Sequence, residues 1–289
     1  MRLRSIAPPA LLALLALLVA ACADPSSQGR SPTPVIAHPS AGDDLLVRWG
    51  SEGGFTPPEY QLTSLPAFSL YGDGTIVRSG PQIEIYPGPA LPALEVVRVD
   101  EAGIQAILEA AFDAGLDSLG DLTDMGSVGV ADAPETVFTL RAGGVDRTVR
   151  VYALGEAGGR LPGMSEEEFD ARTALLGFVD DLSSLESWLP EGSIGAPAVY
   201  ETTGVRAFIS SYTPQADLPQ EAIEWPLDQP LRRAGEDAGA GFRCIVVTGD
   251  EWAVLAPAVD RANQLTPWTS DGRRFSVSFR PLLPDETGC

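Results

Sequence analysis

Hydrophobic and polar positions alternate with a period of two in several short segments of this chain, which is the pattern of half-buried strands. Two of these segments, residues 67–71 and 75–78, flank Asp73-Gly74. Asp-Gly between two strand-like runs predicts a tight hairpin, because both residues tolerate positive φ. The same pattern predicts further strands, at residues 45–49, 82–86, 94–99, 136–141, 147–152, 205–211, 242–247 and 275–279.

Apolar residues recur every three to four positions in two longer segments, which predicts amphipathic helices. The first helix is predicted over residues 101–114, with Asp100 as its cap. The second is predicted over residues 165–189, because Ser165 and Glu168 have the spacing of a capping box.

A third helix is predicted after Thr248 and Glu251, which also have the spacing of a capping box, and Pro257 predicts a kink or two short helices. Strands and helices alternate too irregularly for a doubly wound parallel sheet. We therefore expect an α+β fold in which antiparallel hairpins pack with about three helices. Two packed subdomains are expected, residues 44–192 and a smaller one over 193–289, which carries the C-terminal disulfide argued below.

The N-terminus has the layout of a secretory signal peptide. Arg2 and Arg4 precede an apolar run over residues 10–20, and small residues then precede Cys22. The run is shorter than the roughly 20 apolar residues that a permanent transmembrane helix needs. Because a cysteine directly follows the small residues, this segment resembles a bacterial lipoprotein signal. The alternative is an ordinary signal peptide whose cysteine falls at the cleavage site.

The resemblance implies that residues 1–21 are removed and that the thiol of Cys22 carries a lipid. Two or more acyl chains hold a protein stably on a membrane. We expect residues 22–43, rich in proline and serine, to be a disordered tether that holds the domain on the extracytoplasmic face of the cell membrane. The Tyr71-Gly72-Asp73-Gly74-Thr75 hairpin is followed by a predicted helix and a second predicted hairpin. With this arrangement residues 45–152 resemble small uncharacterised secreted bacterial domains, and this second resemblance implies no activity.

The chain is strongly acidic and contains no lysine. Its formal net charge is −21, and removing the two arginines of the signal peptide would change it to −23. An acidic surface repels the phosphates of nucleic acids, so no nucleic-acid partner is expected.

Two cysteines remain after Cys22, and an extracytoplasmic setting permits a disulfide between Cys244 and Cys289. Closing a loop of this length stabilises the fold by about 4 kcal/mol in the chain-entropy model. A pair of reactive thiols is the alternative, but the two cysteines do not form a C-x-x-C motif.

Several catalytic chemistries lack their residues. The single histidine, His38, lies in the expected tether, and without lysine there is no Walker A motif, no Schiff base and no lysine general base. No cofactor is expected. Carboxylates remain, so a pair of acidic residues acting on a polysaccharide, possibly with a cation, is the enzymatic alternative.

Two groups of residues are candidates for binding. Asp117, Asp121 and Asp124 form the densest acidic loop cluster and either bind Ca²⁺ or face solvent, although their spacing does not match an EF-hand loop. Trp49, Phe55 and Tyr60 surround a loop rich in glycine and proline, and either contact a partner or close a core.

Together these patterns favour a lipid-anchored extracytoplasmic protein with a binding or assembly role at the cell envelope and no catalytic activity. Its partner would be an envelope protein or a glycan. The alternative is the carboxylate-dependent enzyme acting on envelope polysaccharide.

Overall fold

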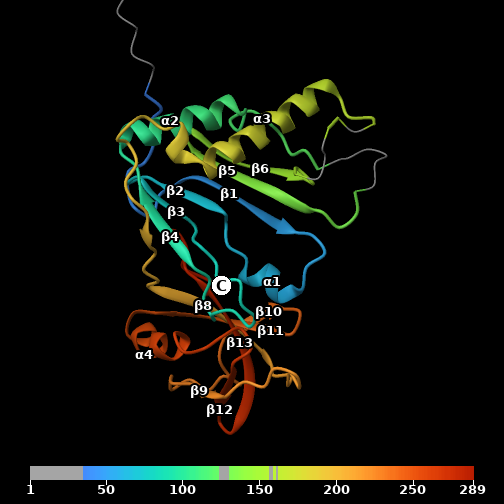
Figure 1. The fold of residues 1–289 in the computed structure, drawn as a ribbon, viewed down its shortest axis with the longest axis vertical. Coiled ribbons are helices and arrows are strands. Elements are labelled where there is room, and N and C mark those ends of the chain that lie inside the picture. Colours follow the sequence, from blue (N-terminus) through green and yellow to red (C-terminus); the bar gives the residue numbers. More distant parts are fainter. Residues whose placement is uncertain (1–34, 124–129, 156–158, 161) are drawn as a thin grey trace, which may run out of the picture. The chain divides into compact units, whose positions relative to one another are not determined.

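The computed structural model describes residues 35–123, 130–155, 159–160 and 162–289. These residues form two β-sheets with four α-helices and one 3₁₀ helix (Figure 1). The fold is α+β, as predicted, with the sheets predominating. The predicted signal peptide and Cys22 lie outside the described residues.

The first sheet has seven strands in the order β6-β5-β1-β2-β3-β4-β7, and all neighbours are antiparallel. Its strands are β1 (Leu45–Gly53), β2 (Phe68–Tyr71), β3 (Thr75–Ser79), β4 (Leu94–Arg98), β5 (Pro134–Ala142), β6 (Val145–Tyr152) and β7 (Ala198–Val199).

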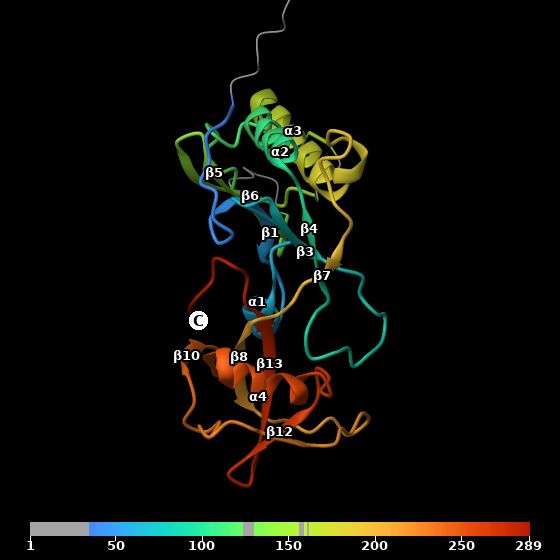
Figure 2. The ribbon, with the colours of Figure 1, turned by 90° about the vertical axis from the view of Figure 1, so that its left-hand side faces the viewer.

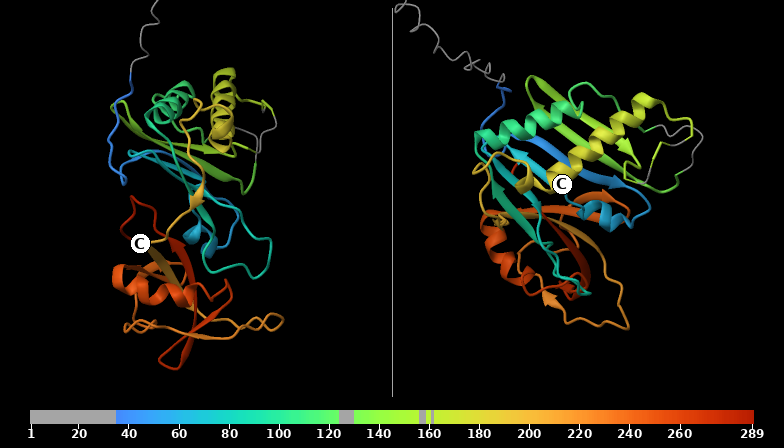
Figure 3. Two further views of the ribbon diagram at one scale, coloured as in Figure 1. Left: turned by 60° about the vertical axis from the view of Figure 1, so that its left-hand side comes forward. Right: turned by 45° about the horizontal axis from the view of Figure 1, so that its top comes forward.

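Two long helices, α2 (Glu101–Asp113) and α3 (Glu166–Ser183), lie side by side over one face of this sheet (Figure 3). Their predicted caps are confirmed: Asp100 accepts a hydrogen bond from the backbone N–H of Gly103, and Ser165 accepts one from that of Glu168. The apolar side chains of the sheet and the two helices form the first core.

The second sheet has six strands in the order β10-β11-β8-β13-β12-β9. Its strands are β8 (Gly204–Ser211), β9 (Ile223–Glu224), β10 (Glu236–Gly239), β11 (Phe242–Thr248), β12 (Pro267–Ser270) and β13 (Arg273–Pro281). Only β9 and β12 pair in parallel. Helix α4 (Gly249–Val259) packs on β8 and β11. A second core surrounds the fully buried Trp268, which meets Trp225 and Phe279 edge to face at 5.6 and 5.4 Å between ring centroids.

The loop between β3 and β4 links the two sheets (Figure 2). The backbone N–H of Gly88 donates to the side chain of Gln264, and the N–H of Ala90 donates to the carbonyl of Ala262. Ala90 and Leu91 also pack against the second core. The predicted strand at residues 82–86 is absent. The side chain of Gln82 instead connects the two ends of this loop, because its Nε2 donates hydrogen bonds to the carbonyls of Gly80 and Ala93.

Several helix predictions need correction. The described residues contain a fourth helix, α1 (Pro58–Thr63), in a segment for which no helix was predicted. The second predicted helix ends at Ser183, before a 3₁₀ turn, η1 (Leu185–Ser187). Thr248 makes no side-chain capping bond, and α4 is one helix that contains Pro257 in its last turn. Pro257 lacks the N–H that would bond the carbonyl of Ala253, but only two helical residues follow it, so little of the helix lies beyond the position that it disturbs.

The end of the predicted tether, residues 36–43, packs on the first sheet and α2. Ile36 exchanges two hydrogen bonds with the side chain of Gln105, and the carbonyl of Ala37 accepts one from Gly143. The ring of His38 contacts Glu101 at 3.3 Å. Residues 36–43 therefore belong to the fold rather than to a disordered tether, because Ile36 adds apolar area to the first core. The rest of the predicted tether lies outside the described residues.

The β2–β3 turn gives a stability prediction with a matched control. Gly74 and Gly144 both have φ of +80°, but a Cβ at Gly74 would lie 2.1 Å from the carbonyl oxygen of Val99, whereas one at Gly144 would meet nothing within 4 Å. Gly144→Ala should lower the unfolding free energy by about 1–2 kcal/mol, the cost of a left-handed conformation. Gly74→Ala should lower it by about 4 kcal/mol, because steric overlap adds to that cost. Urea denaturation of both variants tests this, and equal losses would contradict it.

Candidate functional site

The first sheet has a polar face on the side away from α2 and α3. Directly opposed residues of an antiparallel pair share a face. Val47 and Trp49 lie opposite buried residues of β5 and belong to the helix-covered face. The intervening residues of β1, β5 and β6 form three rows on the other face, which is polar except at Gly50 and Val137. The rows are Arg48, Thr139 and Thr148; Gly50, Val137 and Arg150; and Glu52 and Glu135.

This polar face forms one wall of a cleft of about 320 Å³, at the small end of the range of ligand pockets. The cleft is lined by Arg48, Gly50, Ser51, Glu52, Ser64, Leu65, Pro66, Val137, Thr139, Thr148, Arg150, Arg280 and Glu286. Gly50 shapes it, because a Cβ at that position would lie 3.0 Å from the Cα of Pro66. The absence of a side chain lets the segment before β2 approach the sheet.

Asp285, from the C-terminal tail, binds the first sheet. Its Oδ1 accepts hydrogen bonds from Nη2 of Arg48 at 2.6 Å and from the hydroxyl of Tyr71 at 2.8 Å. Arg48 is held from its other side, since its Nε donates to Ser69. Burial alone would raise the pKa of Asp285, but the hydrogen bond and charge of Arg48 outweigh burial and lower that pKa below its ordinary value.

Glu286, the next residue, binds the second sheet. Nη1 and Nη2 of Arg280 donate to its two carboxylate oxygens at 2.6 and 2.9 Å, and Arg206 lies at 3.7 Å. Nε of Arg280 also donates to the carbonyl of Ser64, in the segment before β2. Burial alone would raise the pKa of Glu286, but the hydrogen bonds and charge of Arg280 outweigh burial and lower it. We call Asp285, Glu286 and the three arginines Arg48, Arg206 and Arg280 the C-terminal clasp.

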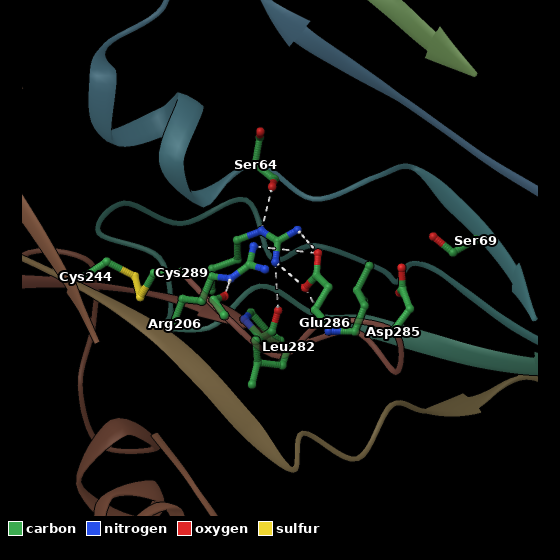
Figure 4. A network of polar contacts seen from close by, with 12 residues as sticks. Ser64, Ser69, Arg206, Cys244, Leu282, Asp285, Glu286 and Cys289 are labelled. Carbon is green, nitrogen blue, oxygen red and sulfur yellow. Dashed lines mark hydrogen bonds and ion pairs between the residues drawn. A yellow bond between two sulfur atoms is a disulfide. The ribbon is translucent and has the colours of Figure 1, made fainter. Parts of the chain in front are cut away.

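A disulfide and a small apolar cluster hold the tail that carries the clasp. Cys244 of β11 and Cys289 are joined as predicted, with a Cα–Cα distance of 5.9 Å (Figure 4). Leu283 packs against Leu45 and Tyr71 of the first sheet. The tail is therefore held before Asp285 by Leu283 and after Glu286 by Cys289. Because these contacts already restrict the tail, forming the ion pairs costs less conformational entropy.

Arg150 lies at the cleft with 41% of its side chain exposed. Its Nη1 donates to Glu52 at 2.7 Å and to Glu135 at 3.2 Å. Its Nε and Nη2 have no hydrogen-bond partner within the described part of the chain, so two donors of this guanidinium remain for a ligand.

The two carboxylates that line the cleft, Glu52 and Glu286, are both ion-paired with arginines. A glycosidase needs one carboxyl group that stays protonated near neutral pH, which requires a raised pKa. The pKa of Glu286 is instead lowered by Arg280. The cleft thus presents fixed hydrogen-bonding groups, and Glu286 is ionised rather than poised as an acid.

The predicted aromatic candidates separate into two kinds. Phe55 and Tyr60 are 88% and 60% exposed. Trp49 instead packs against the first core, opposite Phe68 and Phe138. The structure therefore leaves two of the three aromatic side chains accessible to a partner.

The acidic loop cluster makes local contacts where it can be followed. Asp121 accepts a hydrogen bond from the backbone N–H of Arg150, and Asp117 accepts one from Ser118. Asp124 lies outside the described residues. Within the described residues, no group of three or more histidine, cysteine or acidic side chains could hold a metal ion.

The residues of the cleft were not predicted as a site. The alternation of residues 147–152 separates Arg150 from Val149 and Val151, but it does not show that Arg150 and Arg48 share a face, which the pairing of β1, β5 and β6 decides. Nothing in the sequence pairs Arg48 with Asp285, which follows it by 237 positions.

Comparison with known proteins identifies no relative: no family model matches this chain, and no curated protein or solved structure matches it. In the part of the chain that is described, no helix is both long and apolar enough to cross a membrane.

The clasp predicts a pH dependence of stability. Because the pKa values of Asp285 and Glu286 are lower in the folded state, the unfolded state binds more protons in acid, and the unfolding free energy falls as the pH drops below about 5. Glu286→Gln should reduce this slope and lower stability at neutral pH by about 3 kcal/mol, because Arg280 loses its buried partner.

Urea denaturation at a series of pH values measures both effects. Asp146→Asn is the control, because Asp146 is 79% exposed and pairs with Arg141 on the surface. A wild-type slope in Glu286→Gln would contradict the role given to the clasp.

Proposed function

We propose that this chain is a lipid-anchored extracytoplasmic protein that binds a polar ligand at the cell envelope without catalysing a reaction. The observation that carries the binding role is the cleft beside the C-terminal clasp. Its arginines are already held by carboxylates, so its hydrogen-bonding groups are fixed before a ligand arrives, which reduces the entropy cost of binding.

The anchor in this proposal is a lipid on Cys22, with residues 1–21 removed. The basic start, the apolar run and the small residues before Cys22 support it. In this proposal the chain between Cys22 and Ile36 connects the lipid to the domain, which includes Ile36.

The two sheets are proposed to act as two packed subdomains, close to residues 44–192 and 193–289. Separate hydrophobic cores support this division. Strand β7, at Ala198–Val199, pairs with β4 of the first sheet, so the chain crosses between the sheets a few residues later than the sequence indicated.

The alternative, an enzyme that uses carboxylates on an envelope polysaccharide, has less support. It requires two acidic side chains of different protonation in one cleft. Glu52 and Glu286 are the acids that line the cleft, and both are neutralised by arginine.

Native mass spectrometry of the protein, gently extracted from its own membrane, tests the proposal. We expect the mass of a lipid on Cys22 together with a non-covalent small-molecule adduct. Arg150→Ala should remove the adduct, because two free donors of the cleft are lost. Arg141→Ala is the matched control, since Arg141 lies on the neighbouring strand β5 and pairs with Asp146 away from the cleft. A lipidated mass without adduct, or an adduct that survives Arg150→Ala, would contradict the binding role of the cleft.

The exposed Phe55 and Tyr60 support a second role, contact with an envelope protein. The same spectra would then show a protein adduct, and Phe55→Ala should reduce its fraction at least tenfold, as truncating an interface anchor does. Val254→Ala is the control, because Val254 is also exposed but lies on α4. An unchanged protein adduct in Phe55→Ala would exclude Phe55 from the contact.

A further inference from the structure

The charges and hydrogen-bonding groups of the cleft restrict its ligand. We infer that the cleft binds a neutral sugar unit, in preference to an anion. This inference rests on the proposed binding function and adds the chemical class of the ligand.

Charge balance is the first observation. Each arginine that lines the cleft has its own carboxylate: Arg48 pairs with Asp285, Arg150 with Glu52 and Glu135, and Arg280 with Glu286. An anionic ligand would have to compete with these internal carboxylates. It would also approach a chain whose formal net charge is −21. A neutral ligand meets neither cost.

The mixture of donors and acceptors is the second observation. The free donors are Nη1 of Arg48 and the Nε and Nη2 atoms of Arg150, which have no partner among the described residues. Thr139 and Thr148 place two hydroxyls 3.4 Å apart, and Oε1 of Glu52 is a further acceptor. A sugar hydroxyl both donates and accepts a hydrogen bond, so adjacent hydroxyls of one ring can bind such a mixed set. An ionised carboxylate offers acceptors only.

The shape of the cleft is the third observation. Leu65, Pro66 and Val137 give it a small apolar surface beside the polar row. The C–H face of a sugar ring can cover such a surface while its hydroxyls bond the polar side. The small volume suits a single sugar unit better than a long oligosaccharide.

Titration of the full chain with matched sugars tests the inference, with binding followed by ligand-observed NMR. The probes are glucose and galactose, each compared with its uronate, which differs only in a carboxylate at C6. We expect at least one neutral sugar to bind. The matching uronate should bind at least tenfold more weakly, because every arginine that lines the cleft is already paired with a carboxylate.

A double variant, Thr139→Val with Thr148→Val, should weaken binding of that sugar at least tenfold, because it removes two hydroxyls while keeping the shape of the side chains. Thr248→Val is the control, since Thr248 is an exposed residue of the second sheet that makes no capping bond and does not line the cleft. Arg150→Ala is a second variant, two positions after Thr148 on β6, and it should weaken binding by a similar factor because it removes the free guanidinium donors.

Tighter binding of a uronate, or of inorganic phosphate, would overturn the inference in favour of an anion site. If no sugar binds but the native spectra show a small adduct that Arg150→Ala removes, the sugar class is wrong and the binding function stands. If neither sugar nor adduct is found, both fail.

Discussion

The ion pairs made by Asp285 and Glu286 are the interaction on which the arrangement of the two sheets depends. These neighbouring residues reach different sheets: Asp285 binds Arg48 and Tyr71 of the first, and Glu286 binds Arg280 and Arg206 of the second. Each of these charged side chains is at most 20% exposed, so each pair depends on a nearly complete geometry to offset the loss of hydration. Removing one partner would leave an uncompensated charge between the sheets.

The clasp also builds the cleft. Arg48, Arg280 and Glu286 belong to both, so the groups that would meet a ligand are the same groups that fix the tail. Fixed groups lose little entropy on binding, which suits recognition of a small polar molecule. The same ion pairs lower the pKa of Glu286 and oppose a role in acid catalysis.

Features with a local cause were predictable. The Asp73-Gly74 hairpin, the caps at Asp100 and Ser165, and the alternation of β13 all depend on residues a few positions apart. The strands β7, β9, β10 and β12 were missed because they are two to four residues long and are stabilised by neighbours from elsewhere in the sheet. The packing of Ile36 on Gln105 was missed for the same reason.

The sequence by itself indicated the longer strands and the helices α2, α3 and α4, the acidic character, a disulfide between Cys244 and Cys289 with reactive thiols as the alternative, and the absence of lysine chemistry. It also carries the lipoprotein-like N-terminus. Only the tertiary structure decided which arginines become buried, which carboxylates neutralise them, and that a cleft lies beside them. Periodicity and capping are short-range properties that a linear pattern records. An ion pair such as Arg48 with Asp285 depends on how two sheets pack, and no local pattern encodes that packing.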